Sequence, residues 1–221
     1  EIEVDHEDSA IVIYMQGPDD SLETRATVNL LGSIVRTPFF ETLRTERQLG
    51  YVVNAGTMPI LDTNGLIMYI ESPNTDPITL EDNINEFLLG YEDELAEMSQ
   101  EMFDDIKAGV LNNMRQKPQR MSGLSGRFWN DILVEEYEQD STLLMADAIE
   151  AITKDQILAY YREYVANPDS GRLVSRAAGR SHQEIFLAGK ASESDDIVTV
   201  EESIESYNAF KADAELYYFG N

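Results

Sequence analysis

Two side chains that can stabilise a negative charge lie seven positions apart, at Arg44 and Tyr51. Arg44 is a permanent cation that presents a planar fork of N–H donors, and Tyr51 carries a phenolic O–H donor. Aimed together at a carbonyl oxygen that another group polarises, they could stabilise an oxyanion. A structural interpretation is also open, in which Arg44 complements the C-terminal end of a helix and Tyr51 packs in a strand. From the residue types alone, the structural interpretation is the simpler one.

The sequence offers little else for hydrolytic chemistry. It has no cysteine, which excludes a cysteine nucleophile, a thiolate metal site and a disulfide framework. Its two histidines, His6 and His182, each lie in a polar stretch near one end, where we expect them to be solvated. A zinc site ordinarily takes three protein ligands, and no G-x-S-x-G motif accompanies the histidines. We therefore expect no metal ion, cofactor or self-contained catalytic site in this chain.

Acidic residues dominate the charge of the chain. Of the 221 residues, 42 are acidic and 16 are basic, which gives a net charge of −26 at neutral pH. Such a surface repels phosphate backbones and anionic lipid head groups, so we expect neither nucleic acid nor a membrane as a partner. Two explanations of the acidity stay open: a preference for basic peptides, or a habitat of high ionic strength that screens self-repulsion.

The elements that lead to Arg44 are predicted from the spacing of apolar residues. Residues 10–15 are rich in β-branched side chains and apolar on both alternating faces, which indicates a strand inside a sheet. A helix capped by Ser21 should follow. Pro38 should separate it from a shorter helix at about residues 39–48, which carries Arg44.

The elements after Arg44 are predicted to form a hairpin. Gly50 should adopt a left-handed conformation that ends the short helix and turns the chain into the next strand. Strands are expected at residues 51–53 and 66–70, so that Tyr51 opens the first of them. The loop between these strands would contain Pro59, Asp62, Asn64 and Gly65.

The remainder of the chain is predicted to be mainly helical. Apolar stripes and caps indicate further helices, followed by a last, half-exposed strand at residues 173–177 near a sheet edge. The expected helices cover about residues 80–98, 100–117, 124–133, 143–149 and 154–166, with caps at Ser99 and Thr153. Together the elements indicate an α+β fold, with helices packed on a mixed or antiparallel sheet.

Composition divides the chain into three parts. Residues 1–180 should form one α/β domain without a zinc site, and residues 181–196 a variable acidic connector. Residues 197–221 are rich in aromatic side chains and should form an arm that docks on a neighbouring surface. The chain lacks an initiating Met and a signal-peptide pattern, so we expect a piece of a longer protein. Bacterial periplasm and cytoplasm are both compatible with it.

The segment that carries Arg44 and Tyr51 resembles a family signature. Residues 38–53 read PFFETLRTERQLGYVV. This string is similar to the pattern F-[FY]-x-x-L-R-T-x-x-Q-L-G-Y in the C-terminal half of pitrilysin/insulysin-type zinc metallopeptidases, whose zinc motif is H-x-x-E-H. The likeness runs from about Ser9 to Asn221, with residues 181–196 as a variable stretch.

The resemblance implies a role within a larger peptidase. Members of this family chain four homologous α/β domains into two halves that close around a peptide chamber, with zinc and its ligands in the N-terminal half. This chain looks like the fourth domain, which lacks the zinc motif and should not hydrolyse peptides alone. Its partners would be the N-terminal domains of the same polypeptide and a peptide substrate. Arg44 and Tyr51 match the residues that contact substrate or oxyanion.

An alternative function belongs to another class. The same domain type also occurs in catalytically inert interaction or structural subunits of the family, such as the partner subunit of a processing peptidase or a core-type subunit. The presence or absence of H-x-x-E-H upstream in the same open reading frame would distinguish the two.

Overall fold

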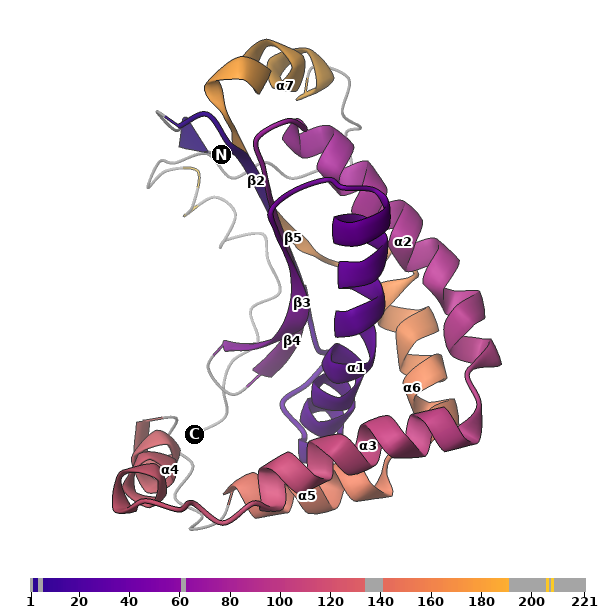
Figure 1. Ribbon diagram of the computed structural model, residues 1–221, viewed down its shortest axis with the longest axis vertical. Coiled ribbons are helices and arrows are strands. Elements are labelled where there is room, and N and C mark those ends of the chain that lie inside the picture. Colours follow the sequence, from indigo (N-terminus) through magenta and orange to yellow (C-terminus); the bar gives the residue numbers. More distant parts are fainter. Residues whose placement is uncertain are drawn as a thin grey trace.

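A five-stranded sheet lies at the centre of the computed structural model, which describes residues 2–3, 6–60, 63–133, 141–190, 206 and 208. The strand order is β1-β5-β2-β4-β3 (Figure 1). The strands are β1 Ile2–Glu3, β2 Ser9–Gln16, β3 Val52–Ile60, β4 Thr63–Ser72 and β5 Leu173–Ala178. β1 runs parallel to β5, and the other neighbours pair antiparallel. The predicted α+β class with a mixed sheet is confirmed.

Helices cover one face of this sheet. α1, α2 and α6 lie on the same side of the strands, α3 and α5 lie below them, and α4 lies at the lower left of the view (Figure 1). The α-helices are α1 Leu22–Phe40, α2 Pro77–Glu97, α3 Gln100–Arg115, α4 Met121–Leu133, α5 Ser141–Ala151, α6 Lys154–Tyr160 and α7 Gln183–Lys190. Shorter segments are the π-helices η1 Glu41–Glu46 and η2 Tyr161–Val165, and the 3₁₀-helix η3 Arg180–His182.

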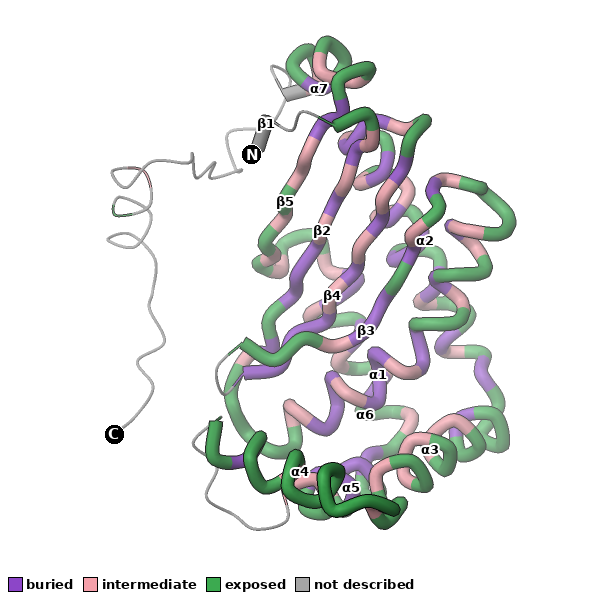
Figure 2. The backbone as a smooth tube through the Cα atoms, turned by 60° about the vertical axis from the view of Figure 1, so that its left-hand side comes forward, coloured by how far each residue is buried: buried purple, intermediate pink, exposed green. Residues whose placement is uncertain are grey.

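Side-chain alternation along the strands decides which face is covered. Ile11 of β2 lies opposite Ile70 of β4, and both side chains are fully buried under the helices. The next pair, Val12 and Tyr69, points to the other face and is only half-buried. Buried and half-buried residues therefore alternate along the central strands (Figure 2). An antiparallel arrangement tolerates this because one face can pack on the core while the other meets solvent.

Local capping signals place several helix starts where the sequence predicts them. The side chain of Ser21 accepts a hydrogen bond from the backbone N–H of Thr24, and Ser99 accepts one from Met102. Thr153 and Gln156 form the predicted capping box at the start of α6. These predictions are confirmed because capping depends on residues only two or three positions apart.

The prediction that Pro38 separates two helices is wrong. α1 continues through Pro38 to Phe40 and passes directly into η1. An internal proline removes one helical hydrogen bond, but the helical pattern continues beyond it, because the N–H of Glu41 donates to both Thr37 O and Pro38 O. Val35 and Phe39 are fully buried on either side of Pro38, so core packing holds this turn helical.

The prediction of a left-handed Gly50 is also wrong. Among the described residues Gln48 is the non-glycine residue with a positive φ, at 53°, and no described glycine has one. Gly50 is needed for space instead, since a Cβ there would lie 2.1 Å from the carbonyl oxygen of Glu71. The turn into β3 thus combines a strained Gln48 with a close backbone approach at Gly50.

The predicted hairpin is present but longer than expected. β3 and β4 pair antiparallel from Val52 opposite Glu71 to Ile60 opposite Thr63. Pro59, Asn64 and Gly65 therefore lie in the strands and not in the predicted loop, whereas Asp62 lies outside the described residues. Pro59 lies in β3, an edge strand of the described sheet, and edge strands are where proline is tolerated within a sheet.

The chain continues as regular structure after β5. The last predicted strand is confirmed as β5, which has only the two-residue β1 on its outer side. Helix α7 lies within the predicted connector of residues 181–196. Its Phe186 is buried, which the weak apolar periodicity of this stretch did not indicate. Residues 191–196 and, except for 206 and 208, the predicted arm at 197–221 lie outside the described residues. The three-part division stays a prediction.

Candidate functional site

The π-helix η1 sets the direction of Arg44. In a π-helix the backbone bonds run from residue i to i−5, so the added residue per turn rotates the side chains that follow. The N–H of Arg47 donates across this span to Thr42 O at 2.9 Å. Leu43 is fully buried and fixes the inner side of η1, which leaves the neighbouring Arg44 half-buried at the surface.

The turn after η1 sets the position of Tyr51. The N–H of Leu49 donates to Leu43 O at 3.0 Å, which closes the end of η1. The N–H of Tyr51 then donates to Glu71 O at 3.2 Å, at the point where Gly50 lies against the same carbonyl. Tyr51 is therefore tied to the end of β4 before the regular β3–β4 pairing begins.

Arg44 and Tyr51 line the same surface pocket, which has a volume of about 510 Å³. The two residues predicted from the sequence are thus brought together on one open hollow. The residues that complete the lining come from the end of α1, from η1 and its turn, and from the loop after β4; they are Phe40, Thr45, Gln48, Leu49, Gly50, Pro73 and Asn74.

Arg44 has no hydrogen-bond or ion-pair partner among the residues that the structure describes. Arg47, one turn further along, contrasts with it, because its guanidinium binds Asn83 Oδ1 at 2.7 Å and Glu86 Oε2 at 2.8 Å. In a chain with a net charge of −26, an arginine without a carboxylate partner is notable. Its N–H donors are available to a carbonyl or carboxylate oxygen that enters the pocket.

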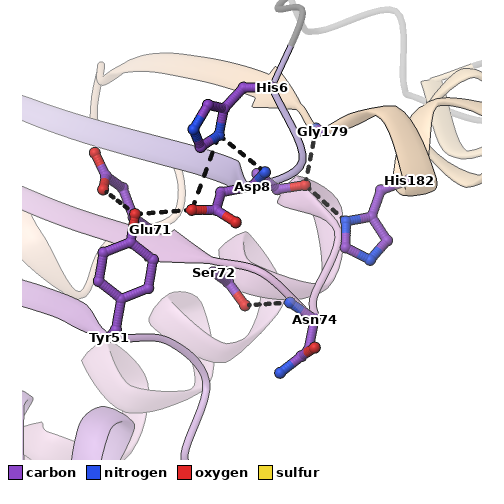
Figure 3. Close-up of polar contacts among 9 residues, drawn as sticks. His6, Asp8, Tyr51, Glu71, Ser72, Asn74, Gly179 and His182 are labelled. Atoms are coloured by element: carbon purple, nitrogen blue, oxygen red, sulfur yellow. Dashed lines mark hydrogen bonds and ion pairs between the residues drawn. The ribbon is translucent and has the colours of Figure 1, made fainter.

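The hydroxyl of Tyr51 contacts two carboxylates (Figure 3). Its oxygen lies 2.8 Å from Asp8 Oδ2 and 2.8 Å from Glu71 Oε2, while half of the side chain, 51%, is exposed. Hydrogen bonding to Asp8 first and to Glu71 second raises the pKa of the Tyr51 phenol well above its usual range. The phenol is therefore a protonated donor at neutral pH.

Sequence reasoning missed Asp8 and Glu71. Each is one of 42 acidic residues, and they lie 43 and 20 positions from Tyr51. Glu71 could have been found from the hairpin, because correct pairing places it opposite Val52, next to Tyr51. Asp8 carries no such signal, since only the pairing of β2 with β4 brings it near.

The two histidines lie close to this group of residues. The prediction of a solvated histidine is confirmed for the exposed His6, whose Nδ1 accepts a hydrogen bond from the N–H of Asp8 at 3.1 Å. It is wrong for the half-buried His182, whose Nδ1 lies 2.9 Å from Ser9 Oγ. Ser9 also accepts from the N–H of Gly179 and is fully buried, so this Ser–His pair joins β2 to η3 and is closed to substrate.

The described residues do not fit a metal site, because they contain no group of three or more His, Cys, Asp or Glu side chains that could hold a metal ion. No helix in the described ranges is both long and apolar enough to cross a bilayer. The residues that line the pocket include a guanidinium with several N–H donors and a phenol whose hydroxyl contacts Asp8 and Glu71.

Comparison with known proteins places the pocket in a family context. Residues 30–129, which include Arg44 and Tyr51, match the family described as PQQ synthase PqqF-like, C-terminal lobe domain 4. The insulin-degrading enzyme of Mus musculus is 29% identical over 161 residues, 73% of this chain and 16% of that protein. The A-factor-processing enzyme of Saccharomyces cerevisiae is 30% identical over 154 residues, 70% of this chain and 15% of that protein.

Solved structures agree with this assignment. The crystal structure of pitrilysin matches with a TM-score of 0.73 and 26% identity over 80% of this chain and 19% of that one. The inactive peptidase domain of a putative zinc protease from Bordetella parapertussis has the same fold, with a TM-score of 0.63 and 15% identity over 79% of this chain and 94% of that one. The chain thus spans less than a fifth of the length of the curated relatives reported above. It belongs to the pitrilysin/insulysin-type peptidase family, as a domain of the C-terminal lobe.

Proposed function

We propose that this domain forms one wall of the peptide chamber of a pitrilysin-like zinc metalloendopeptidase. Its contribution to cleavage is the pair Arg44 and Tyr51, which contact the substrate or its oxyanion near a zinc site in the N-terminal half of the same polypeptide. The observation that carries this proposal is that an arginine without a partner among the described residues and a protonated tyrosine line one open pocket.

The chemistry of peptide hydrolysis matches these two side chains. When nucleophilic water adds to a peptide carbonyl, negative charge develops on the carbonyl oxygen, and fixed donors around that oxygen lower the barrier. A zinc ion bound in the other half would supply the activated water. Arg44 offers a permanent charge with several N–H groups, and Tyr51 offers one O–H. Neither needs to give up a proton, so both act by binding and orientation.

The sheet supports the chamber-wall part of the proposal. Helices α1, α2 and α6 cover one face, whereas half-buried side chains such as Val12 and Tyr69 point to the other. Glu71, next to Tyr51, lies on this same side because it is two positions from Tyr69 along β4. A peptide lying over this face would therefore pass beside the phenol.

Kinetics of the intact peptidase that contains this domain test the proposal. Arg44→Ala and Tyr51→Phe should each lower kcat/KM for a quenched fluorescent peptide by about ten- to a hundredfold, the range for losing a hydrogen bond to a charged group. Arg47→Ala is the matched control, since it removes an arginine from the same segment that already binds Glu86. It should change kcat/KM by less than about twofold. Wild-type kcat/KM in both Arg44→Ala and Tyr51→Phe would refute the proposed role.

A catalytically inert subunit is the second candidate. One solved structure with this fold is described as the inactive peptidase domain of a putative zinc protease, and its 15% identity to this chain supports the fold alone. The two candidates differ in the remainder of the polypeptide. An H-x-x-E-H motif upstream in the same reading frame supports the enzyme, and a chain without one supports the inert subunit.

A further inference from the structure

The Tyr51 hydroxyl has two carboxylate acceptors within hydrogen-bond distance but only one hydrogen to donate. A phenol carries one O–H hydrogen, yet the oxygen of Tyr51 lies 2.8 Å from a carboxylate oxygen of Asp8 and 2.8 Å from one of Glu71. The hydroxyl can therefore donate to one carboxylate at a time. The other carboxylate remains an alternative acceptor within reach, so the proton can change partner without movement of the ring.

The two carboxylates are held more firmly than the phenol. Asp8 directly precedes β2 and its side chain is only 20% exposed, while Glu71 lies in β4 between Ala10 of β2 and Val52 of β3. Tyr51 is 51% exposed at the rim of the pocket. A half-exposed ring without fixed partners would sample several rotamers, and ordering it on substrate binding would cost conformational entropy.

Charges on three sides define the surroundings of the phenol. Asp8, which directly precedes β2, and Glu71 of β4 both face the hydroxyl, and His6 Nδ1 lies 3.8 Å from Asp8 Oδ2. Arg44 lines the same pocket from η1. The carboxylates raise the pKa of Tyr51, which suppresses its ionisation although the ring is exposed.

We propose that Asp8 and Glu71 are positioning residues for Tyr51, which fix its hydroxyl beside the pocket that Tyr51 lines and so present it to a substrate oxygen. On peptide binding the single O–H turns from a carboxylate to the substrate, and no proton is transferred. This inference rests on the proposed contact between Tyr51 and substrate. It adds two residues, from the start of β2 and the end of β4, to the groups that set the position of Tyr51.

Ionisation of Tyr51 in the intact peptidase tests this clamp, the contacts of Asp8 and Glu71 with the Tyr51 hydroxyl, independently of activity. Tyrosines labelled with ¹³C at Cζ report ionisation by NMR, and the signal of Tyr51 is the one lost in Tyr51→Phe. In the wild type Tyr51 should remain protonated at pH 11. In the isosteric double variant Asp8→Asn/Glu71→Gln it should titrate near the ordinary phenol value of about 10. Glu7→Gln, which removes an adjacent charge that does not contact Tyr51, should leave the signal unchanged.

Kinetics then decide whether the clamp serves catalysis. Asp8→Ala/Glu71→Ala should lower kcat/KM by about two- to tenfold, the range for ordering one side chain. In a Tyr51→Phe background the same pair of substitutions should have no further effect, because the carboxylates act through the hydroxyl. An equal loss in both backgrounds would overturn the inference in favour of a merely structural role.

The two experiments separate failure of the inference from failure of the proposed function. A wild-type Tyr51 that titrates near 10, or a signal unaffected by Asp8→Asn/Glu71→Gln, overturns the clamp even if Tyr51→Phe impairs cleavage. Unimpaired cleavage in Tyr51→Phe overturns the substrate role of Tyr51 and the catalytic use of the clamp, while the NMR titration still shows whether the carboxylates hold the phenol. The isosteric amide variants, checked by thermal unfolding, keep the NMR test valid if the alanine pair does not fold.

Discussion

Replacing Gly50 with alanine should disturb the site without removing any polar group from it. An added Cβ would lie 2.1 Å from Glu71 O and 3.0 Å from the carbonyl carbon, and backbone atoms cannot rotate aside as a side chain can. An ordinary contact begins at 3.4 Å, so the turn must move away from β4 by about 1.3 Å. That movement breaks the bond from the N–H of Tyr51 to Glu71 O, now 3.2 Å.

The expected cost of Gly50→Ala is about 1–3 kcal/mol in the free energy of unfolding, the usual range for overpacking at a buried position. Urea unfolding followed by far-UV circular dichroism measures it, since the single tryptophan, Trp129, is 61% exposed and reports the core poorly. In the intact peptidase the same substitution should lower kcat/KM, because a shift of about 1 Å misplaces the Tyr51 hydroxyl.

Gly90→Ala is the matched control for Gly50→Ala. Gly90 lies inside α2, and a Cβ there would meet nothing within 4 Å. This substitution should stabilise the chain by about 0.5–1 kcal/mol, because alanine has the higher helix propensity. If Gly50→Ala were as stable as the wild type and cleaved peptide normally, the close approach at Glu71 would not determine the position of Tyr51.

Two further predictions concern the ends of α2. Burial opposes ionisation of the N-cap residue Asp76, but its hydrogen bonds to Thr79 and Ile78 outweigh this and lower its pKa. The ionised carboxylate therefore stabilises the folded chain fully above the unfolded pKa of about 3.9, and this stabilisation is lost as pH falls through the lower folded pKa. Asp76→Ala should lower the free energy of unfolding, measured by urea unfolding, by about 1 kcal/mol at pH 7 and by less at pH 3. At the other end, Lys154 Nζ donates to Ala96 O at 2.7 Å and Met98 O at 2.5 Å. Lys154→Met should leave these carbonyls unpaired and lower the thermal unfolding midpoint, whereas an unchanged midpoint would show that water replaces the ammonium.

Features set by neighbouring residues could be predicted from the sequence. The caps at Ser21, Ser99 and Thr153 are confirmed because a hydroxyl reaches the N–H two or three residues ahead whatever the remainder of the chain does. The stripe of α2 and the α+β class follow from hydrophobic periods that repeat over many residues. The site role of Arg44 and Tyr51 was predicted from the resemblance of residues 38–53 to a family signature, since from their types and spacing alone the structural interpretation is the simpler one.

Features set by contacts distant in sequence depended on the tertiary structure. Pro38 stays helical because the core holds Val35 and Phe39, and Gly50 is required because β4 passes close to it. The clamp of Asp8 and Glu71 on Tyr51 exists only once β2, β3 and β4 are in register. A sequence records which residues can donate and accept hydrogen bonds. Burial and strand pairing between residues tens of positions apart decide which acceptor a donor meets, because their free energies outweigh the conformational preferences of single residues.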